Sequence, residues 1–519
     1  MKEPRRFHEA AWNEPIIMEM GSEGERGVLL PEVEPEVKAM VGDVLATIPA
    51  GLRRQEAPQL PELSQPQVLR HYLRLSQETL GTDISIDIGH GTCTEKYSPK
   101  VNEQLVRLPE MTSIHPLQDE DTVQGILEIM YRFEEVLKLV SGLDKFSFQP
   151  TGGAQGIYAN ACIIRAYHAE RGEADRRDEI ITTIFSHPVD AASPKTAGYK
   201  IVTLYPGENG YPELDALKAA VSDRTAGLMI TNPEDTGIYN PHIADFVRIV
   251  HEAGGLCAYD QANANGLLGV ARAREADFDL CQFNLHKTFS SPHGSRGPGT
   301  GAIGVKKELA RFLPVPTVEY DGQRYYLNYD LPDSIGKVRG FYGVPPVVLR
   351  SYAWAVAMGA AGMKEAGEIA VLNNLYLIKK MSEVPGFGLP FPNNQYRLAE
   401  IRGTWEKLRE DTGIGTEDIM RRMVDFGLTN YFGGHHPWVI PEPCQLEPAE
   451  SYSKADIDEF VAVLKHVAHE AYTNPDLVKS APHNSTIRQV DLSPVDDPDR
   501  WAITWRAYLR KHRGSGSPI

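Results

Sequence analysis

The sequence has few cysteines, and their spacing fits neither a disulfide framework nor a metal cluster. Its 519 residues include five: Cys93, Cys162, Cys257, Cys281 and Cys444. The number is odd, the spacing is wide and no CxxC pair occurs, which favours reduced thiols in the cytoplasm. No cluster of Cys and His with metal-ligand spacing is visible, so we expect no metal site.

An excess of basic residues and a long apolar run are also missing. The net charge is −17, which argues against nucleic acid or an anionic membrane as a partner. The most apolar stretch, 351–363, is too short to span a bilayer. Residues 1–15 contain no apolar segment typical of a signal peptide. We therefore expect a soluble, cytoplasmic protein.

The length exceeds that of one ordinary domain, and no internal repeat is present. Composition and periodicity predict four segments. These are an N-terminal arm with helices (1–100), a large α/β domain (101–345), a smaller α+β domain (346–475) and a peripheral tail (476–519).

Helical and strand patterns alternate within the large domain. A helix is expected at 67–80 in the N-terminal arm, and the helices of the large domain are expected at 122–140, 153–170, 213–221 and 244–251. Strands are expected at 179–186, 200–205, 226–233, 256–260, 279–286 and 301–305. This alternation predicts crossover units and a mostly parallel sheet. After residue 345 the pattern is mainly helical, with a short strand or two.

Two features of this region suit a phosphorylated ring. The segment QPTGGAQG (149–156) places glycines directly before a helix, where backbone N–H groups and the helix dipole favour a phosphate. His187 follows a strand, at the sheet edge where ligands bind in open α/β folds, and an imidazole there can stack on an aromatic ring. An ordinary glycine-rich turn and a structural histidine remain the alternatives.

Two further residues suit carbanion chemistry. Asp260 ends a strand, and a carboxylate beside a pyridine nitrogen keeps that nitrogen protonated, as an electron sink requires. Lys287 follows an apolar strand in NLHKTF (284–289), and burial favours a nucleophilic amine. The alternatives are a helix-capping aspartate and a surface lysine. The order of phosphate loop, histidine, aspartate and lysine predicts a pyridoxal-phosphate (PLP) enzyme.

Motifs along nearly the whole chain resemble glycine dehydrogenase (decarboxylating), the P-protein of the glycine cleavage system, and above all the second subunit of its two-chain form. The motifs are RHYLRLSQ (70–77), GTCTEKYSPK (91–100), FQPTGGAQG (148–156), TNPEDTG (231–237), AYDQANANGLLG (258–269), NLHKTFSSPHG (284–294), LEPAESYSKADID (446–458) and SAPHNSTIRQ (480–489).

The resemblance implies the aspartate-aminotransferase fold (fold type I) and PLP as cofactor. It implies Lys287 as the Schiff-base lysine, Asp260 as the partner of the pyridine nitrogen and His187 as the stacking residue. The implied phosphate contacts are Gly153, Ala154 and Gln155, and the further cofactor contacts are Asn263 and His286. The reaction that the resemblance implies is decarboxylation of glycine, with transfer of the aminomethyl group to the lipoyl arm of H-protein. The assembly that it implies is an α2β2-like heteromer with a homologous first subunit.

Three motifs depart from the family pattern beside the expected site. HGSRGPG stands for HGGGGPG, with Ser295 and Arg296 in place of glycines. HPVDAAS (187–193) stands for HGTNPAS, with Pro188, Val189 and Asp190 replacing its second to fourth residues. HGTCTEKY (90–97) stands for LGSCTMKY. The residues expected near the substrate are His90, Thr92, Glu95 and Arg296.

These departures leave the substrate open. They fit tolerated drift in a glycine-decarboxylating subunit, and equally a paralogous PLP decarboxylase, lyase or transferase with another amino acid or acceptor. A catalytically silent scaffold is a third reading, disfavoured because Lys287, Asp260 and His187 are all present. The adjacent His435 and His436 favour a substrate-channel or structural loop over a metal site.

Overall fold

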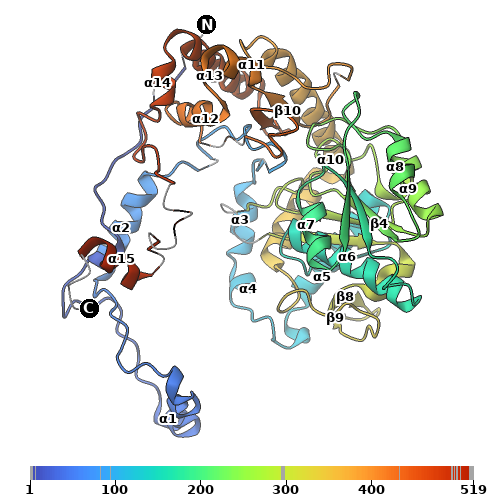
Figure 1. Ribbon diagram of the computed structural model, residues 1–519. Helices are drawn as coiled ribbons and strands as arrows, with labels where there is room; N and C mark the ends of the chain where they lie inside the picture. The colour runs from blue at the N-terminus through green and yellow to red at the C-terminus, as the bar shows by residue number, and fades with distance from the viewer. Residues whose placement is uncertain are drawn as a thin grey trace. The chain divides into compact units, whose positions relative to one another are not determined.

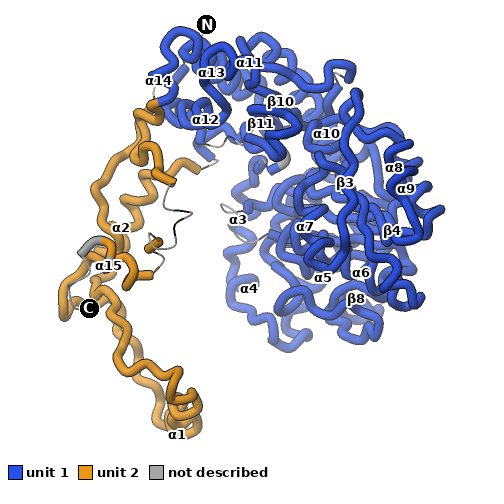
Figure 2. The backbone as a smooth tube through the Cα atoms, viewed as in Figure 1, with its two compact units in different colours: residues 1–5, 82–479 blue, residues 6–81, 480–519 orange. Residues whose placement is uncertain are grey.

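The computed structural model describes residues 4–5, 7–81, 83–93, 95–293, 299–394, 396–429, 431, 433–492, 495, 497, 501–502 and 504–513. The chain divides into two compact units (Figure 2). Unit 1 comprises residues 1–5 and 82–479, and unit 2 comprises residues 6–81 and 480–519. The predicted segments 101–345 and 346–475 both fall in unit 1, and the boundary between them stays a prediction.

A seven-stranded sheet forms the centre of unit 1 (Figure 1). Its strands, in spatial order, are β1 (Lys145–Ser147), β7 (Gly301–Val305), β6 (Leu280–Asn284), β5 (Leu256–Asp260), β4 (Thr225–Thr231), β2 (Glu179–Thr183) and β3 (Lys200–Leu204). Neighbours from β6 to β3 pair in parallel, whereas β7 is antiparallel to both β6 and β1. The mostly parallel sheet and fold type I are therefore confirmed.

Apolar side chains cover both faces of the sheet, because successive strand residues point to opposite faces. In β5, Leu256 and Ala258 join one core cluster, and Cys257 and Tyr259 join the other. The first cluster is covered by α6 (Gly153–Glu170) with α7 (Val189–Thr196), and the second by α5 (Gln124–Ser141), α8 (Leu214–Ala220) and α9 (Ile243–Glu252).

A smaller α+β part follows the long helix α10 (Pro345–Met381), which is interrupted at Gly359, where φ is 62°. Strands β10 (Ile401–Thr404) and β11 (Pro443–Leu446) pair antiparallel. Around them lie α11 (Glu406–Thr412), α12 (Thr416–Val424), α13 (Lys454–Thr473) and α14 (Pro475–Lys479). Their apolar faces share one core with Trp405 and Phe460, which agrees with the predicted mainly helical region.

The remaining elements of unit 1 are short. They are η4 (Gly91–Cys93), α3 (Lys100–Val106), α4 (Pro109–Thr112), η5 (Glu120–Thr122), η6 (Ala273–Ala276), η7 (Lys307–Phe312) and the hairpin of β8 (Thr317–Tyr320) with β9 (Tyr325–Asn328). The described residues of 86–93 and 95–99 are irregular apart from η4, as is typical of a segment with several glycines and a proline.

Unit 2 has little regular structure. It contains η1 (Ile17–Glu19), α1 (Pro35–Val41), η2 (Val44–Thr47), η3 (Ala50–Leu52), α2 (Gln65–Gln77) and α15 (Trp505–Arg513). Glu14 accepts hydrogen bonds from His71 at 2.8 Å and Arg74 at 3.1 Å, which ties the chain to α2. Several large apolar side chains remain exposed, including Leu30 and Met40 at 85% each.

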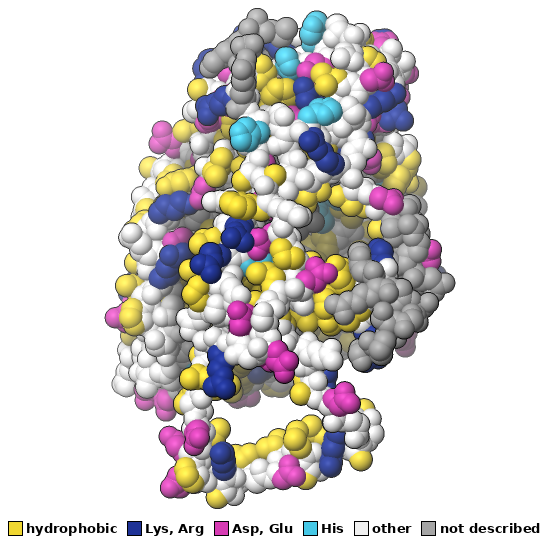
Figure 3. Space-filling view, turned by 90° about the vertical axis from the view of Figure 1, so that its left-hand side faces the viewer, with side chains coloured by type: hydrophobic (Ala, Val, Ile, Leu, Met, Phe, Trp, Pro, Cys, Tyr) yellow, Lys and Arg dark blue, Asp and Glu magenta, His cyan; other side chains and the backbone are white. Residues whose placement is uncertain are grey.

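Two further features concern the surface charge and the apolarity of the helices. Acidic and basic side chains are interspersed on the face shown in Figure 3. Among the described helices, none combines the length and apolarity needed to cross a membrane.

Candidate active site

The predicted catalytic residues follow strands that end at one edge of the sheet. Asp260 is the last residue of β5, and its pairing partners are Thr231 on β4 and Gln282 on β6. His187 follows β2, and Lys287 follows β6. Because parallel strands place their carboxyl ends at one edge, residues 100 positions apart in the chain (287 − 187) meet there.

Two cavities adjoin at these residues, and His187, Asp260, Ala262 and Lys287 line both. We call one the helix-side cavity, because it reaches the N-terminus of α6. Its other lining residues include His90, Glu95, Gly153, Ala154, Asn284 and His286. We call the other the small-domain cavity, which reaches the region of β10. Its other lining residues include Thr231, Asp235, Asn263, Leu267, Glu400 and His435.

Asp260 is held as a hydrogen-bond acceptor. Its Oδ1 accepts the N–H of Ala262 at 2.9 Å and the side-chain N–H of Gln282 at 2.6 Å. Burial raises the pKa of Asp260, while these two donors and the nearby Lys287 act in the opposite direction. Such donors favour the charged carboxylate, which is the form that can pair with a cationic ring nitrogen.

His187 is held as a neutral ring. Its Nδ1 accepts the N–H of Val189 at 3.1 Å, which assigns the proton to Nε2. Burial, with a smaller contribution from Lys287, lowers the pKa of His187 to about 3. A neutral imidazole with an open face is suited to stacking on an aromatic ring.

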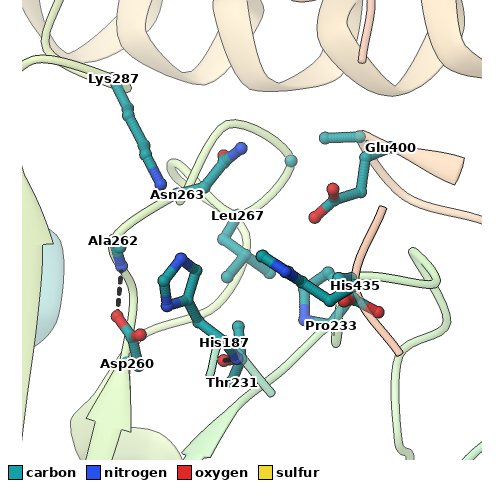
Figure 4. Close-up of a pocket in the computed structure, with 13 residues that line it drawn as sticks. His187, Thr231, Pro233, Asp260, Ala262, Asn263, Leu267, Lys287, Glu400 and His435 are labelled. Carbon is teal, nitrogen blue, oxygen red and sulfur yellow. Dashed lines mark hydrogen bonds between the residues drawn. The ribbon is translucent and has the colours of Figure 1, made fainter. Parts of the chain in front are cut away.

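Lys287 is buried, with 7% of its surface exposed. Its side chain points toward Asn263 and the small-domain cavity, with Glu400 and His435 on the far side (Figure 4). Its backbone N–H bonds to the carbonyl of Asn284 at 3.0 Å, which fixes the turn after β6. An amine in this position could react with the carbonyl carbon of an aromatic aldehyde whose ring is held by His187 and Asp260.

The other end of the helix-side cavity suits an anion. Gly153 and Ala154 form the first turn of α6, whose leading N–H groups have no partner within the helix. A Cβ on Gly153 would lie 3.0 Å from the Asn284 side chain, so this approach needs glycine. The buried atoms Asn284 Oδ1 and His286 Nδ1 have no hydrogen-bond partner among the described residues. Unpaired buried polar atoms beside a helix N-terminus indicate a polar ligand.

Known families match most of this chain. The Aminotransferase class-V family matches residues 152–341, and the glycine dehydrogenase C-terminal domain matches residues 366–488. The probable glycine dehydrogenase (decarboxylating) subunit 2 of Pyrococcus horikoshii is 43% identical over 507 residues, which cover 97% of this chain and 98% of that protein. Its counterpart from Thermococcus gammatolerans is 44% identical, with 98% and 99% covered.

The chain belongs to the glycine dehydrogenase (decarboxylating) subunit 2 family. A solved structure of glycine decarboxylase (P-protein) of the glycine cleavage system, in inhibitor-bound form, superposes with a TM-score of 0.69 at 19% identity. It covers 85% of this chain and 99% of that one, and at this identity it supports the shared fold.

This family depends on PLP, and the described residues fit that cofactor. The helix-side cavity offers a helix N-terminus for the phosphate, a neutral imidazole for the ring and a carboxylate for the ring nitrogen. Lys287 lies at the junction of the two cavities, where it can hold the aldehyde carbon. The phosphate, the ring, the ring nitrogen and the aldehyde of PLP thus each have a suitable side chain or backbone group.

Other residues predicted for the cofactor site occupy more specific positions. Asn263 donates to Glu447 at 2.6 Å and lines the small-domain cavity. His286 packs on His293 in the helix-side cavity, and burial lowers its pKa to about 2. The side chain of Gln155 accepts the N–H of Thr151 at 2.8 Å and donates to the carbonyl of Val338 at 2.6 Å. Its side chain is thus engaged on both sides, its backbone N–H remains for a phosphate, and these cofactor roles stay predictions.

The residues predicted near the substrate are brought together in part. His90 and Glu95 line the helix-side cavity, and burial raises the pKa of Glu95. Arg296 and the side chain of Thr92 lie outside the described residues. His435 lines the small-domain cavity with its ring 5.6 Å from that of His187, which favours the channel interpretation of this loop.

Sequence reasoning missed several residues of the site. Gln282 and Asn284 come from β6, and a polar residue at every second position of an otherwise apolar strand was the available signal. Glu400 comes from the residue before β10, and Asp235 from the loop after β4. Neither has a local pattern that distinguishes it from a surface carboxylate.

Proposed function

We propose that this chain decarboxylates glycine with PLP carried on Lys287 and passes the aminomethyl group to the lipoyl arm of H-protein. The main observation that supports this proposal is that Lys287, Asp260 and His187 lie together at one edge of the sheet, beside the N-terminus of α6. The names of the full-length relatives support glycine as the substrate.

The chemistry that PLP supplies when bound is an electron sink for the pair released from the Cα–carboxylate bond. Asp260, held by Ala262 and Gln282, keeps the ring nitrogen protonated. His187 holds the ring plane by stacking. Nζ of Lys287 would hold the aldehyde carbon of the cofactor and, when free, would supply a basic atom beside the reacting carbon. Leu267 and Ala399 limit the access of water from the small-domain cavity.

We also infer that the chain works in a heteromer with a homologous first subunit, in the cytoplasm. The term "subunit 2" in the names of the relatives supports a partner chain. The apolar side chains exposed on unit 2, such as Leu29 and Leu30, are of the kind that a partner surface covers. The five unpaired cysteines support a reducing compartment.

Exchange of labelled carbon dioxide into the carboxyl group of glycine tests the proposal. The purified chain is assayed alone, with its candidate first subunit, and with that subunit and lipoylated H-protein. We expect exchange in the complete mixture and a visible cofactor absorption in the chain. Absence of exchange in the complete mixture, with the cofactor absorption present, would contradict glycine as the substrate.

A second candidate is a paralogous PLP enzyme that acts on another amino acid. The observation in its favour is the acidic small-domain cavity, where Glu400 and Asp235 lie beyond Lys287. A substrate with a cationic group could reach these carboxylates. Spectral titration of the cofactor with a set of amino acids separates the candidates, because the true substrate perturbs the absorption at the lowest concentration.

A further inference from the structure

Asp190 is a buried carboxyl group that the proposed chemistry does not use. It lies in the first turn of α7 and has no exposed surface. Its backbone N–H donates to the carbonyl of His187 at 2.8 Å, so its position is tied to the predicted stacking residue. Its side chain is in hydrogen-bonding contact with the carboxyl group of Asp260.

The two carboxyl groups differ in the donors they receive. Asp260 accepts from Ala262 and Gln282 through Oδ1. Asp190 accepts one longer bond, from the Thr231 hydroxyl to Oδ2 at 3.3 Å, and apart from the contact with Asp260 no donor among the described residues reaches its Oδ1. Two adjacent carboxylates in a buried site cannot both be charged, so the pair holds a proton.

The surroundings decide which carboxyl group is neutral. Lys287 acts on Asp260, and the ring nitrogen of the cofactor would add a second cation there. Asp190 faces the neutral Thr231 hydroxyl, the neutral His187 loop and the carboxylate of Asp260, and none of these stabilises a second negative charge. Burial and Asp260 both raise the pKa of Asp190 well above its ordinary value.

We propose that Asp190 keeps its proton and donates a hydrogen bond to Asp260, which makes it a positioning residue for the carboxylate that pairs with the cofactor ring. The donated bond orients Asp260 and stabilises its charged form at the pH at which the ring nitrogen must stay protonated. The inference rests on the proposed cofactor site at Asp260. It adds a neutral carboxylic acid behind that carboxylate.

Infrared spectroscopy of the holoenzyme tests the protonation state directly. At neutral pH the wild-type protein should show a carboxylic-acid C=O band that shifts in heavy water, and the band should be absent from Asp190→Asn. Identical spectra in this region would overturn the proposal. This measurement does not depend on enzymatic activity. Absence of the visible cofactor absorption from the wild-type protein would instead contradict the proposed cofactor site.

Affinity for PLP tests the direction of the hydrogen bond. Asp190→Asn keeps a neutral donor and should bind PLP within about threefold of wild type. Asp190→Leu keeps the branching at Cγ but has no donor, and should bind about 10- to 100-fold more weakly, since a hydrogen bond to a charged group is lost. Thr196→Ala, also on α7 but exposed, is the matched control and should bind like wild type.

Two affinity results would also overturn the proposal. Equal weakening in Asp190→Asn and Asp190→Leu would mean that the donor has no role. An Asp190→Asn protein that binds PLP more than about tenfold tighter would place the proton on Asp260 instead, because removal of a neighbouring negative charge would then free that carboxylate. If Asp190→Leu does not fold, the infrared comparison and the Asp190→Asn affinity still decide.

Discussion

The two cavities that adjoin at Lys287 differ in charge. The helix-side cavity combines a helix N-terminus with the neutral rings of His187 and His286, so it favours an anion. The small-domain cavity is bordered by two buried acids, Glu400 and the Arg402-paired Asp235, and burial raises the pKa of both. It therefore favours a neutral group, or a cationic group that would stabilise their ionised forms. This difference supports the proposal that the helix-side cavity holds the cofactor phosphate and that the substrate enters through the small-domain cavity.

The buried acids of the small-domain side are also held less completely. The Asp235 carboxylate pairs with Arg402, yet its Oδ1 has no partner among the described residues, and the adjacent buried Glu234 has only the Thr183 side chain there as a nearby donor. Burial raises the pKa of Asp235 to about 7 and that of Glu234 to about 8. Such incomplete satisfaction is tolerated where a ligand supplies the missing contacts.

The largest expected effect comes from removing the amine that both cavities share. Lys287→Ala should lose the visible cofactor absorption and at least about 1000-fold in exchange activity, because no other described group there can hold the aldehyde carbon. Borohydride reduction followed by peptide mapping is the measurement. Lys306 is the matched control, since it is equally buried at 7% but ion-paired with Asp279 at 2.8 Å. A pyridoxyl label on its peptide, or none on that of Lys287, would contradict the assignment.

Next in size is the contrast between the acids of the two sides. Asp260→Ala should weaken PLP binding by about 2–5 kcal/mol, the typical cost of truncating one partner of a buried charge pair. Glu400→Gln should leave PLP affinity nearly unchanged and instead alter the KM for the amino acid. Both constants come from spectral titration and steady-state exchange. Equal losses of PLP affinity in the two variants would remove the distinction between the cavities.

A smaller effect is expected at the predicted phosphate end. In Gly153→Ala the new Cβ would lie 3.0 Å from the Asn284 side chain and crowd the first turn of α6. PLP affinity should fall by about 0.5–1.5 kcal/mol, the typical net value of one hydrogen bond lost when the turn is displaced from the phosphate. Gly125→Ala is the control, because a Cβ there meets no atom within 4 Å. If both variants bind PLP like wild type, the phosphate lies elsewhere.

The last expected effect, on folding stability rather than on cofactor binding, is a pH dependence on the small-domain side. Because burial raises the pKa of Glu234 to about 8, the folded state binds a proton that the unfolded state releases above its ordinary pKa. Folded-state stability therefore falls as pH rises, by up to about 1.4 kcal/mol per unit until Glu234 ionises. Glu234→Gln lacks this loss. The melting temperature of the variant minus that of wild type should therefore increase between about pH 5 and pH 8. A constant difference across this range would show that Glu234 ionises normally.

Much of the fold follows from local patterns. The helix predicted at 153–170 and the strands predicted at 256–260 and 301–305 have those same bounds in the structure. Others differ at their ends by a few residues, as for the strand predicted at 279–286, where β6 ends at Asn284. Helix α7 was missed, because it has eight residues and contains Pro194, which breaks the helical pattern. Strand β1 has three residues, too few for a periodic signal.

The sequence by itself determined the groups that suit PLP, because each lies in a short motif at the end of a strand or the start of a helix. In a parallel sheet with crossover helices, the carboxyl ends of the strands lie at one edge, so these groups had to come together there. Only the tertiary structure decided which acids accompany them. The contact of Asp190 with Asp260, and the approach of Glu400 to Lys287, join segments 70 and 113 residues apart (260 − 190; 400 − 287). Such contacts depend on strand order and helix packing, which no local pattern records.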